Sequence, residues 1–92
     1  MYQVEWSRDA LDRMTSAWLD GDAALPEAIT TAVSRIDERL ARDPTNTGES
    51  RSAGRRVLFL SPLGIRFRVY TNQETVVVLR AWAIPQRPRP AE

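Results

Sequence analysis

The sequence predicts one α+β domain in which a two-helix hairpin packs on one face of a small antiparallel sheet. Apolar residues recur at helical spacing through residues 8–20 and 26–42. Four shorter segments have the alternation or the β-branched composition of strands: 2–6, 57–60, 65–70 and 75–82. The order is therefore β-α-α-β-β-β, and the short turns between the last three strands favour an antiparallel meander beneath the helices. At 92 residues the chain is long enough for one domain only.

The first helix has a clear start and end in the sequence. Ser7 can cap it, because a serine hydroxyl accepts a hydrogen bond from a free amide in the first turn, and Asp9 complements the helix dipole there. Leu11, Met14 and Trp18 recur at helical spacing. The helix is therefore expected over about residues 8–20, ended by a glycine at position 21.

The second helix is expected to begin near Pro26, since a proline in the first turn loses no hydrogen bond. Its apolar stripe consists of Ile29, Ala32, Val33, Ile36 and Leu40. Asp43 precedes Pro44 and is pushed out of helical geometry, so the helix should end near residue 42. Residues 43–54 are rich in Pro, Thr, Asn, Gly and Ser and are predicted to form a long loop.

Composition limits the chemistry that the chain can perform. Without cysteine or histidine, any reaction must use carboxylates, arginines, hydroxyls or the backbone. No phosphate loop, nucleotide fingerprint or metal-ligand cluster is present, so no cofactor and no metal are expected. No apolar run approaches a membrane span and the N-terminus does not read as a signal peptide, so a cytoplasmic protein without membrane contact is expected.

Charge divides the chain into an acidic and a basic half. Residues 1–48 hold five arginines and nine acidic residues, whereas residues 49–92 hold eight arginines and three glutamates. All thirteen cationic side chains are arginines, whose planar guanidinium suits phosphates and carboxylates. The basic half can therefore meet nucleic acid or an acidic protein.

Strand alternation predicts which basic residues gather on the face of the sheet away from the helices. Ile65, Phe67 and Val69 should meet the helices, so their neighbours point away. In the last strand Val77, Leu79 and Ala81 are assigned to the helix side, with Val76 and Val78 on the open side. The open face should hold Arg56, Arg66, Arg68, Arg80, Tyr70 and Trp82. Such a face suits stacked bases on a phosphate backbone, an acidic partner peptide, or plain solvation, and all three remain open.

Other charged residues carry weaker signals. In the long loop Arg51 could contact a ligand with Glu49 orienting it, but a pair of Glu49 with a nearby arginine such as Arg55, which holds the loop, is the favoured interpretation. Asp37 and Glu38 diverge by about 100° on a helix, so they are interpreted as solvated charges rather than a paired site.

Several strings of residues, in this order and spacing, are similar to the RelE/ParE toxins of bacterial toxin–antitoxin loci, and most similar to a ParE-like branch. They are Val4-Glu5-Trp6-Ser7, Ala10-Leu11, Ile36-Asp37, Asp43-Pro44, Gly48-Glu49-Ser50-Arg51, Arg56-Val57-Leu58-Phe59, Pro62-Leu63-Gly64 and Val76-Val77-Val78-Leu79. The resemblance covers about residues 2–84. It implies a toxin domain over residues 1–84 followed by a flexible, Pro-rich tail at 85–92.

The resemblance also implies partners. Such toxins bind a cognate antitoxin in a hetero-oligomer, and an antitoxin contact is expected at Trp18 and Leu19 on the helix hairpin. ParE members inhibit DNA gyrase, which makes a protein target the first expectation. RelE members cut mRNA on the ribosome, which is the alternative, and a non-toxic binding module on the same fold is a third.

Residues that RelE-type cleavage would need are only partly present. Arg66, in the Gly64-Ile65-Arg66 string, falls where RelE places a catalytic arginine, and only Arg87 lies near the position of the second. The family's lysines are missing, and no tyrosine follows Tyr70. Arginine stays protonated and is a poor base, so ribonuclease chemistry lacks an evident proton acceptor.

Overall fold

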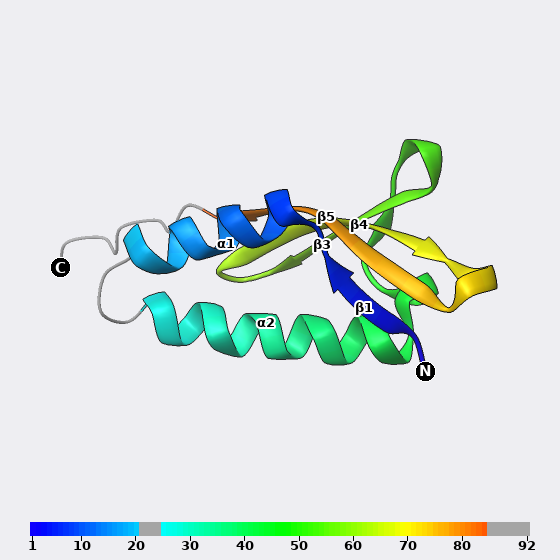
Figure 1. Cartoon of the computed structure of the whole chain (residues 1–92), viewed down its shortest axis with the longest axis horizontal. Coiled ribbons are helices and arrows are strands. Elements are labelled where there is room, and N and C mark those ends of the chain that lie inside the picture. Colours follow the sequence, from blue (N-terminus) through cyan, green and yellow to red (C-terminus); the bar gives the residue numbers. More distant parts are fainter. Residues whose placement is uncertain (21–24, 85–92) are drawn as a thin grey trace, which may run out of the picture.

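The computed structural model describes residues 1–20 and 25–84 (Figure 1). Two helices, α1 (Arg8–Asp20) and α2 (Leu25–Arg42), follow the first strand, β1 (Gln3–Trp6). The remaining strands are β2 (Glu49–Ser50), β3 (Arg55–Leu60), β4 (Leu63–Tyr70) and β5 (Thr75–Ala83). Helices and strands thus lie close to the predicted ranges. The glycine expected to end α1 and the tail at 85–92 lie outside the described residues.

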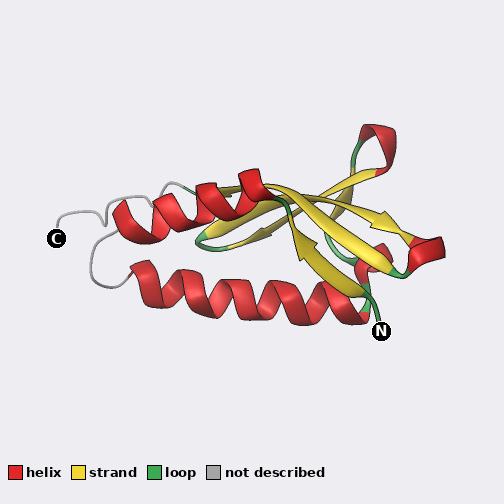
Figure 2. Cartoon of the chain, in the orientation of Figure 1, coloured by secondary structure: helices red, strands yellow, loops and turns green. Residues whose placement is uncertain are grey.

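The five strands form one sheet in the order β1-β5-β4-β3-β2, with the two helices packed against it (Figure 2). This confirms the α+β architecture, but two details of the prediction were wrong. First, β1 pairs with β5 in parallel, so the sheet is mixed rather than antiparallel. Second, the predicted loop at 43–54 contains β2, which pairs antiparallel with β3 through only two residues. So short a strand has too few residues to show an alternation in the sequence.

The core lies between the helices and the middle of the sheet. The helices contribute the buried residues Ala10, Ile29, Ala32, Ile36 and Leu40. The strands contribute Leu58, Leu63, Ile65, Phe67, Val76, Val78 and Ala81. In α1 the buried side is formed by Ala10 with partly buried Met14 and Ala17, while Leu11 and Trp18 are 41% and 43% exposed. The small residues of α1 allow its backbone to approach the sheet closely, which the spacing of its larger residues did not predict.

A β-bulge in β5 changes which of its side chains face the helices. Arg66 pairs with Arg80 and Phe67 with Val78, so Leu79 has no partner in β4. Val76 and Val78 are completely buried, and the prediction that placed them on the open side was wrong. Without the extra residue, the alternation that buries Val78 would also direct Arg80 into the core. The bulge carries Arg80 to the open face, where the sequence analysis had placed it.

Ser7 connects the start of α1 to this bulge. Its hydroxyl accepts a hydrogen bond from the Ala10 amide at 3.1 Å, which confirms the predicted helix cap. The same hydroxyl donates to the Leu79 carbonyl at 2.9 Å, and the Ser7 amide donates to the Val78 carbonyl at 2.9 Å. One side chain therefore satisfies a free amide of the helix and a carbonyl of the bulge.

β1 is fixed to α2 by a second polar contact. The indole nitrogen of Trp6 donates a hydrogen bond to an Asp37 carboxylate oxygen at 2.8 Å, and both residues are half-buried. Asp37 is thus a structural acceptor, and its interpretation as a solvated charge was wrong.

Within the described residues, no helix has the length and apolar character required to cross a membrane.

Replacing Ser7 with alanine should lower the free energy of unfolding by about 1–2 kcal/mol, because both the cap and the bulge lose a partner. Urea titration followed by circular dichroism would measure the change. Ser16→Ala is the control, since Ser16 is an exposed serine inside α1 and its replacement should be neutral or slightly stabilising. Equal stability of Ser7→Ala and the wild-type protein would contradict the proposed link.

Candidate functional site: an arginine face on the sheet

Four arginines lie on the side of the sheet away from the helices. Cross-strand partners point to the same side of a sheet, so the register defines this face. Arg55 is opposite Arg68, and Arg66 is opposite Arg80. Arg66 and Arg68 are two residues apart in β4 and therefore share a side. We call these four residues, Arg55, Arg66, Arg68 and Arg80, the arginine face.

The arginine face is not neutralised by carboxylates. In the part of the chain that the structure describes, none of its four guanidinium groups forms an ion pair. The acidic residues on the same side lie at the margins of the sheet: Glu5 shares a row with Val77, and Glu49 shares a row with Val57. Glu5 is two strands from Arg68 in its row, about 10 Å at the usual strand spacing. Glu49 lies diagonally from Arg55 on the adjacent strand, but its carboxylate pairs with Arg51 instead. The face therefore presents a concentrated positive charge.

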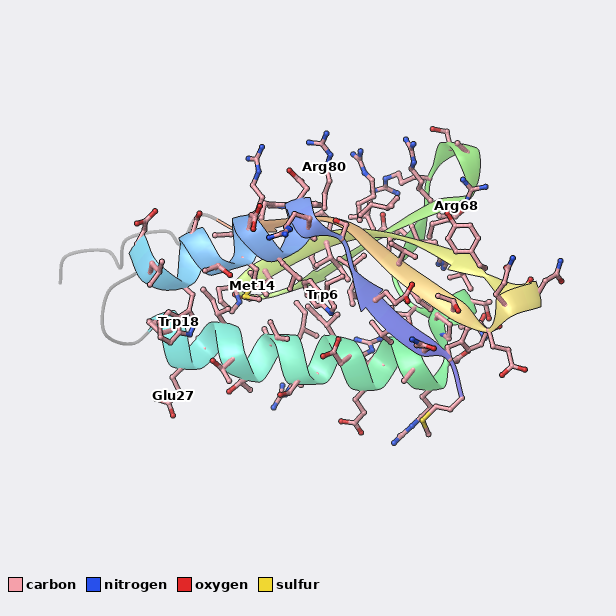
Figure 3. All side chains as sticks on the ribbon, viewed as in Figure 1. Trp6, Met14, Trp18, Glu27, Arg68 and Arg80 are labelled. Carbon is pink, nitrogen blue, oxygen red and sulfur yellow. The ribbon has the colours of Figure 1, made fainter. Side chains whose placement is uncertain are left out.

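One aromatic ring on this face is occupied by an arginine. The guanidinium carbon of Arg68 lies 5.2 Å from the centre of the Tyr70 ring, within cation–π range. Figure 3 shows Arg68 and Arg80 along the upper part of the view, with Trp18 between α1 and α2 and Glu27 below α2.

Two further aromatic rings, Phe59 and Trp82, lie at the other end of the face. Phe59, Gly64 and Trp82 form one row across β3, β4 and β5. Gly64 lets the Trp82 indole lie against the backbone: a side-chain carbon at position 64 would come within 2.5 Å of the ring. Phe59 meets Trp82 edge-on, with ring centres 6.1 Å apart, and is 58% exposed. The arginines thus lie between Tyr70 at one end and this aromatic pair at the other.

The structure changes the membership of the predicted face. Arg66, Arg68, Arg80, Tyr70 and Trp82 lie together as predicted, whereas Arg56 does not. Arg56 is opposite Phe67 on the helix side, where it donates to the Thr47 carbonyl at 2.8 Å and the Gly48 carbonyl at 3.1 Å. It anchors the segment that precedes β2 and is a structural residue.

Arg55 and Phe59 take the place of Arg56, and the sequence analysis missed both. The available signal was alternation in β3, because Arg56 shares its parity with Leu58 and Leu60, which belong to the helix side. Arg51 lies in the connection after β2, and Arg87 lies outside the described residues.

Arg51 forms an exposed ion pair with Glu49, with nitrogen and oxygen 3.0 Å apart. Glu49 therefore pairs with a nearby arginine as predicted, but the partner is Arg51 and not Arg55, which was given as the example. The pair still fits a role in holding the loop, as favoured above. Because both side chains are exposed, it contributes about 0–1 kcal/mol.

An apolar groove of about 330 Å³ lies between α1 and α2. It is lined by Met14, Thr15, Trp18, Ile29, Thr30, Val33 and Ser34. Trp18 is 43% exposed at its border, and the adjacent Leu19 is 67% exposed. Exposed large apolar side chains beside a groove are typical of a protein contact.

The two surfaces differ in chemistry, with positive charge on the open face of the sheet and apolar contact between the helices. The described residues contain no group of three or more acidic side chains arranged to hold a metal ion. On the arginine face, the arginines can stabilise negative charge, but the carboxylates are at the margins and Tyr70 is engaged by Arg68.

Comparison with known proteins shows which known fold this chain shares. No protein-family model and no curated protein sequence matches the chain. Solved structures do. The RelBE2 toxin–antitoxin complex from Mycobacterium tuberculosis matches with a TM-score of 0.72 and 21% identity over 89% of this chain and 90% of that one. The chromosomal ParDE system from P. aeruginosa gives 0.71 and 21% over 92% and 98%.

The isolated RelE toxin from E. coli matches with a TM-score of 0.63 and 14% identity, over 95% of this chain and 88% of that chain. A helix hairpin on one face of a small mixed sheet is thus shared with proteins of toxin–antitoxin systems. The chain has the RelE/ParE toxin fold.

Gly64→Ala should displace the Trp82 indole, because the added carbon cannot fit beneath the ring. The expected loss of stability is about 1–3 kcal/mol, as for overpacking a well-filled site. Thermal unfolding would measure it. In a Trp82→Ala background the same glycine change should cost less than half as much, and an unchanged cost would contradict the contact.

Proposed function

We propose that this chain is the toxin of a bacterial toxin–antitoxin pair, neutralised when a cognate antitoxin binds it. The single observation that carries the proposal is the fold, which matches solved toxin–antitoxin complexes over almost the whole chain. The apolar groove between α1 and α2 supports it, since the groove offers a docking place for an amphipathic segment of a partner. Both proteins are expected in the cytoplasm, where the antitoxin holds the toxin inactive in a hetero-oligomer.

The target that we propose is a protein, with DNA gyrase as the first candidate. Two arguments favour a protein over an RNA substrate. The sequence strings described above are most similar to a ParE-like branch, and ParE toxins are not nucleases. In addition, the arginine face provides positive charge, but among its arginines there is no carboxylate that could accept a proton.

A ribosome-dependent ribonuclease is the second candidate. The observation that favours it is Arg66, which lies at the centre of the arginine face opposite Arg80. In this mechanism the arginines would stabilise the charge that develops on the phosphate, and the ribosome would have to supply the proton acceptor. Cleavage of mRNA in a purified translation system, lost in Arg66→Ala, would select this function.

Induction of the gene alone in a bacterial host should arrest growth, and co-expression of the neighbouring gene should restore it. Plating efficiency before and after induction would measure both effects. Inhibition of gyrase supercoiling by the purified protein, without mRNA cleavage, is then expected. Normal growth with abundant folded protein would contradict the toxin proposal and favour a non-toxic binding module.

Trp18→Ala should weaken antitoxin binding about 10–100-fold while leaving growth arrest intact, because an aromatic anchor at a groove carries much of the energy of a contact. Leu19→Ala should have a smaller effect in the same direction. Titration calorimetry with the purified antitoxin would measure both. Phe59→Ala is the matched control, since Phe59 is also exposed but lies on the opposite side of the sheet. Equal loss in Trp18→Ala and Phe59→Ala would contradict a specific role for the groove.

A further inference from the structure

We propose that the arginine face docks an acidic segment of the toxin's protein target, in which carboxylates about 8 Å apart each bridge one opposed pair of arginines. This inference rests on the proposed function, because it assigns the target contact of a toxin that acts on a protein. It adds which surface makes that contact and what chemistry the partner presents.

The first step in the argument is the energy of the free face. Directly opposed side chains in an antiparallel pair are close neighbours, and like charges at such positions destabilise the sheet. The face contains two such pairs side by side, Arg55 with Arg68 and Arg66 with Arg80. No carboxylate among the described residues relieves either pair. Selection for stability alone would not favour this arrangement.

The second step is the bulge at Leu79. A regular β5 would direct Arg80 toward the helices, and the bulge instead directs it to the open face beside Arg66. The backbone at the bulge is held by Ser7. Arg80 therefore reaches its like-charged neighbour because of a defined local structure.

The third step is spacing. Arg66 and Arg68 are alternate residues of β4, about 6.6–6.8 Å apart along the strand. Their partners lie in β5 and β3, so the centres of the two pairs are also offset by about 4.8 Å across the sheet and lie about 8 Å apart. Carboxylates on alternate residues of an extended peptide have a similar spacing, and their flexible side chains can span the difference. Each can accept paired hydrogen bonds from the planar guanidinium groups. The exposed Phe59 at the end of the face offers an apolar contact to the same segment.

The fourth step distinguishes an acidic protein from a nucleic acid. Proteins that bind single strands expose ring faces on which bases stack. On this face the Tyr70 ring is covered by the Arg68 guanidinium, and the Trp82 indole lies against Gly64 with Phe59 at its edge. Tyr70 and Trp82 thus each pack against a neighbour, and of the three rings Phe59 alone is largely exposed, so the face lacks the series of free rings that stacked bases need. This favours a partner recognised by charge and shape.

The arginine face and the helix groove are on opposite sides of the sheet. Figure 3 shows Arg68 and Arg80 along the upper part of the view, whereas Trp18 lies between α1 and α2 and Glu27 lies below α2. Target contact and antitoxin contact can therefore be altered separately.

The decisive variant is Arg80→Glu, because it separates binding from stability. A glutamate opposite Arg66 converts a like-charge pair into an opposite-charge pair, so the melting temperature should rise by about 2–6 °C. Binding should fall at least tenfold, measured by fluorescence anisotropy with a labelled ten-residue peptide of alternating glutamate and serine. Arg35→Glu is the control: it makes the same change in net charge at an exposed position of α2 and should bind like the wild-type protein.

A ten-nucleotide oligouridine is the competing probe at the same ionic strength. Tighter binding of oligouridine than of the peptide by the wild-type protein would overturn the proposal in favour of a nucleic acid. Equal loss of peptide binding in Arg80→Glu and Arg35→Glu would overturn it in favour of general electrostatic attraction. A lower melting temperature of Arg80→Glu would show that the arginine pair is structural, and Arg80→Gln would then be expected to lose stability as well.

In cells, Arg80→Glu should abolish growth arrest yet still bind the antitoxin with wild-type affinity. Retained arrest would overturn the target assignment. If the wild-type protein itself causes no arrest, the proposed function fails, while the peptide measurements still decide whether the face binds acidic segments.

Discussion

The contact between Ser7 and the β5 bulge is the interaction on which the two surfaces of this protein depend. The hydroxyl caps α1 and holds the carbonyl of Leu79, so the start of the helix and the irregular position of the strand are fixed by one side chain. Val78 can remain in the core while Arg80 faces outward only because of the extra residue between them. Burial of the valines and display of the arginine are therefore coupled.

This coupling explains how a small domain carries two separate binding surfaces. The sheet has one face covered by helices and one face open, as is usual for an α+β layer. On the helix side an apolar groove lies between α1 and α2 beside Trp18, and on the open side arginines lie opposite one another. A partner that covers the groove need not touch the arginines, so in the proposed toxin neutralisation and target contact would use different parts of the surface.

The open face places positive side chains directly opposite one another, and a purely structural surface would avoid this repulsion. Arg55, Arg66, Arg68 and Arg80 oppose one another in pairs, and the carboxylates Glu5 and Glu49 remain at the margins. Functional sites commonly keep such unfavourable local choices, with stability supplied by the rest of the molecule. Here the core between α2 and the central strands supplies it.

The sequence by itself determined the element order, the helix ranges, the Ser7 cap and most of the basic face, because these depend on local periodicity and on single capping residues. Tertiary structure decided what local pattern cannot encode. The parallel β1–β5 pairing joins two segments that are far apart in the sequence. β2 is too short for its residues to show an alternation of apolar and polar side chains. The bulge inverts the parity of β5, and the hydrogen bonds of Arg56 fix it on the helix side. Each of these depends on contacts between residues distant along the chain, whose energies appear only once the strands are paired.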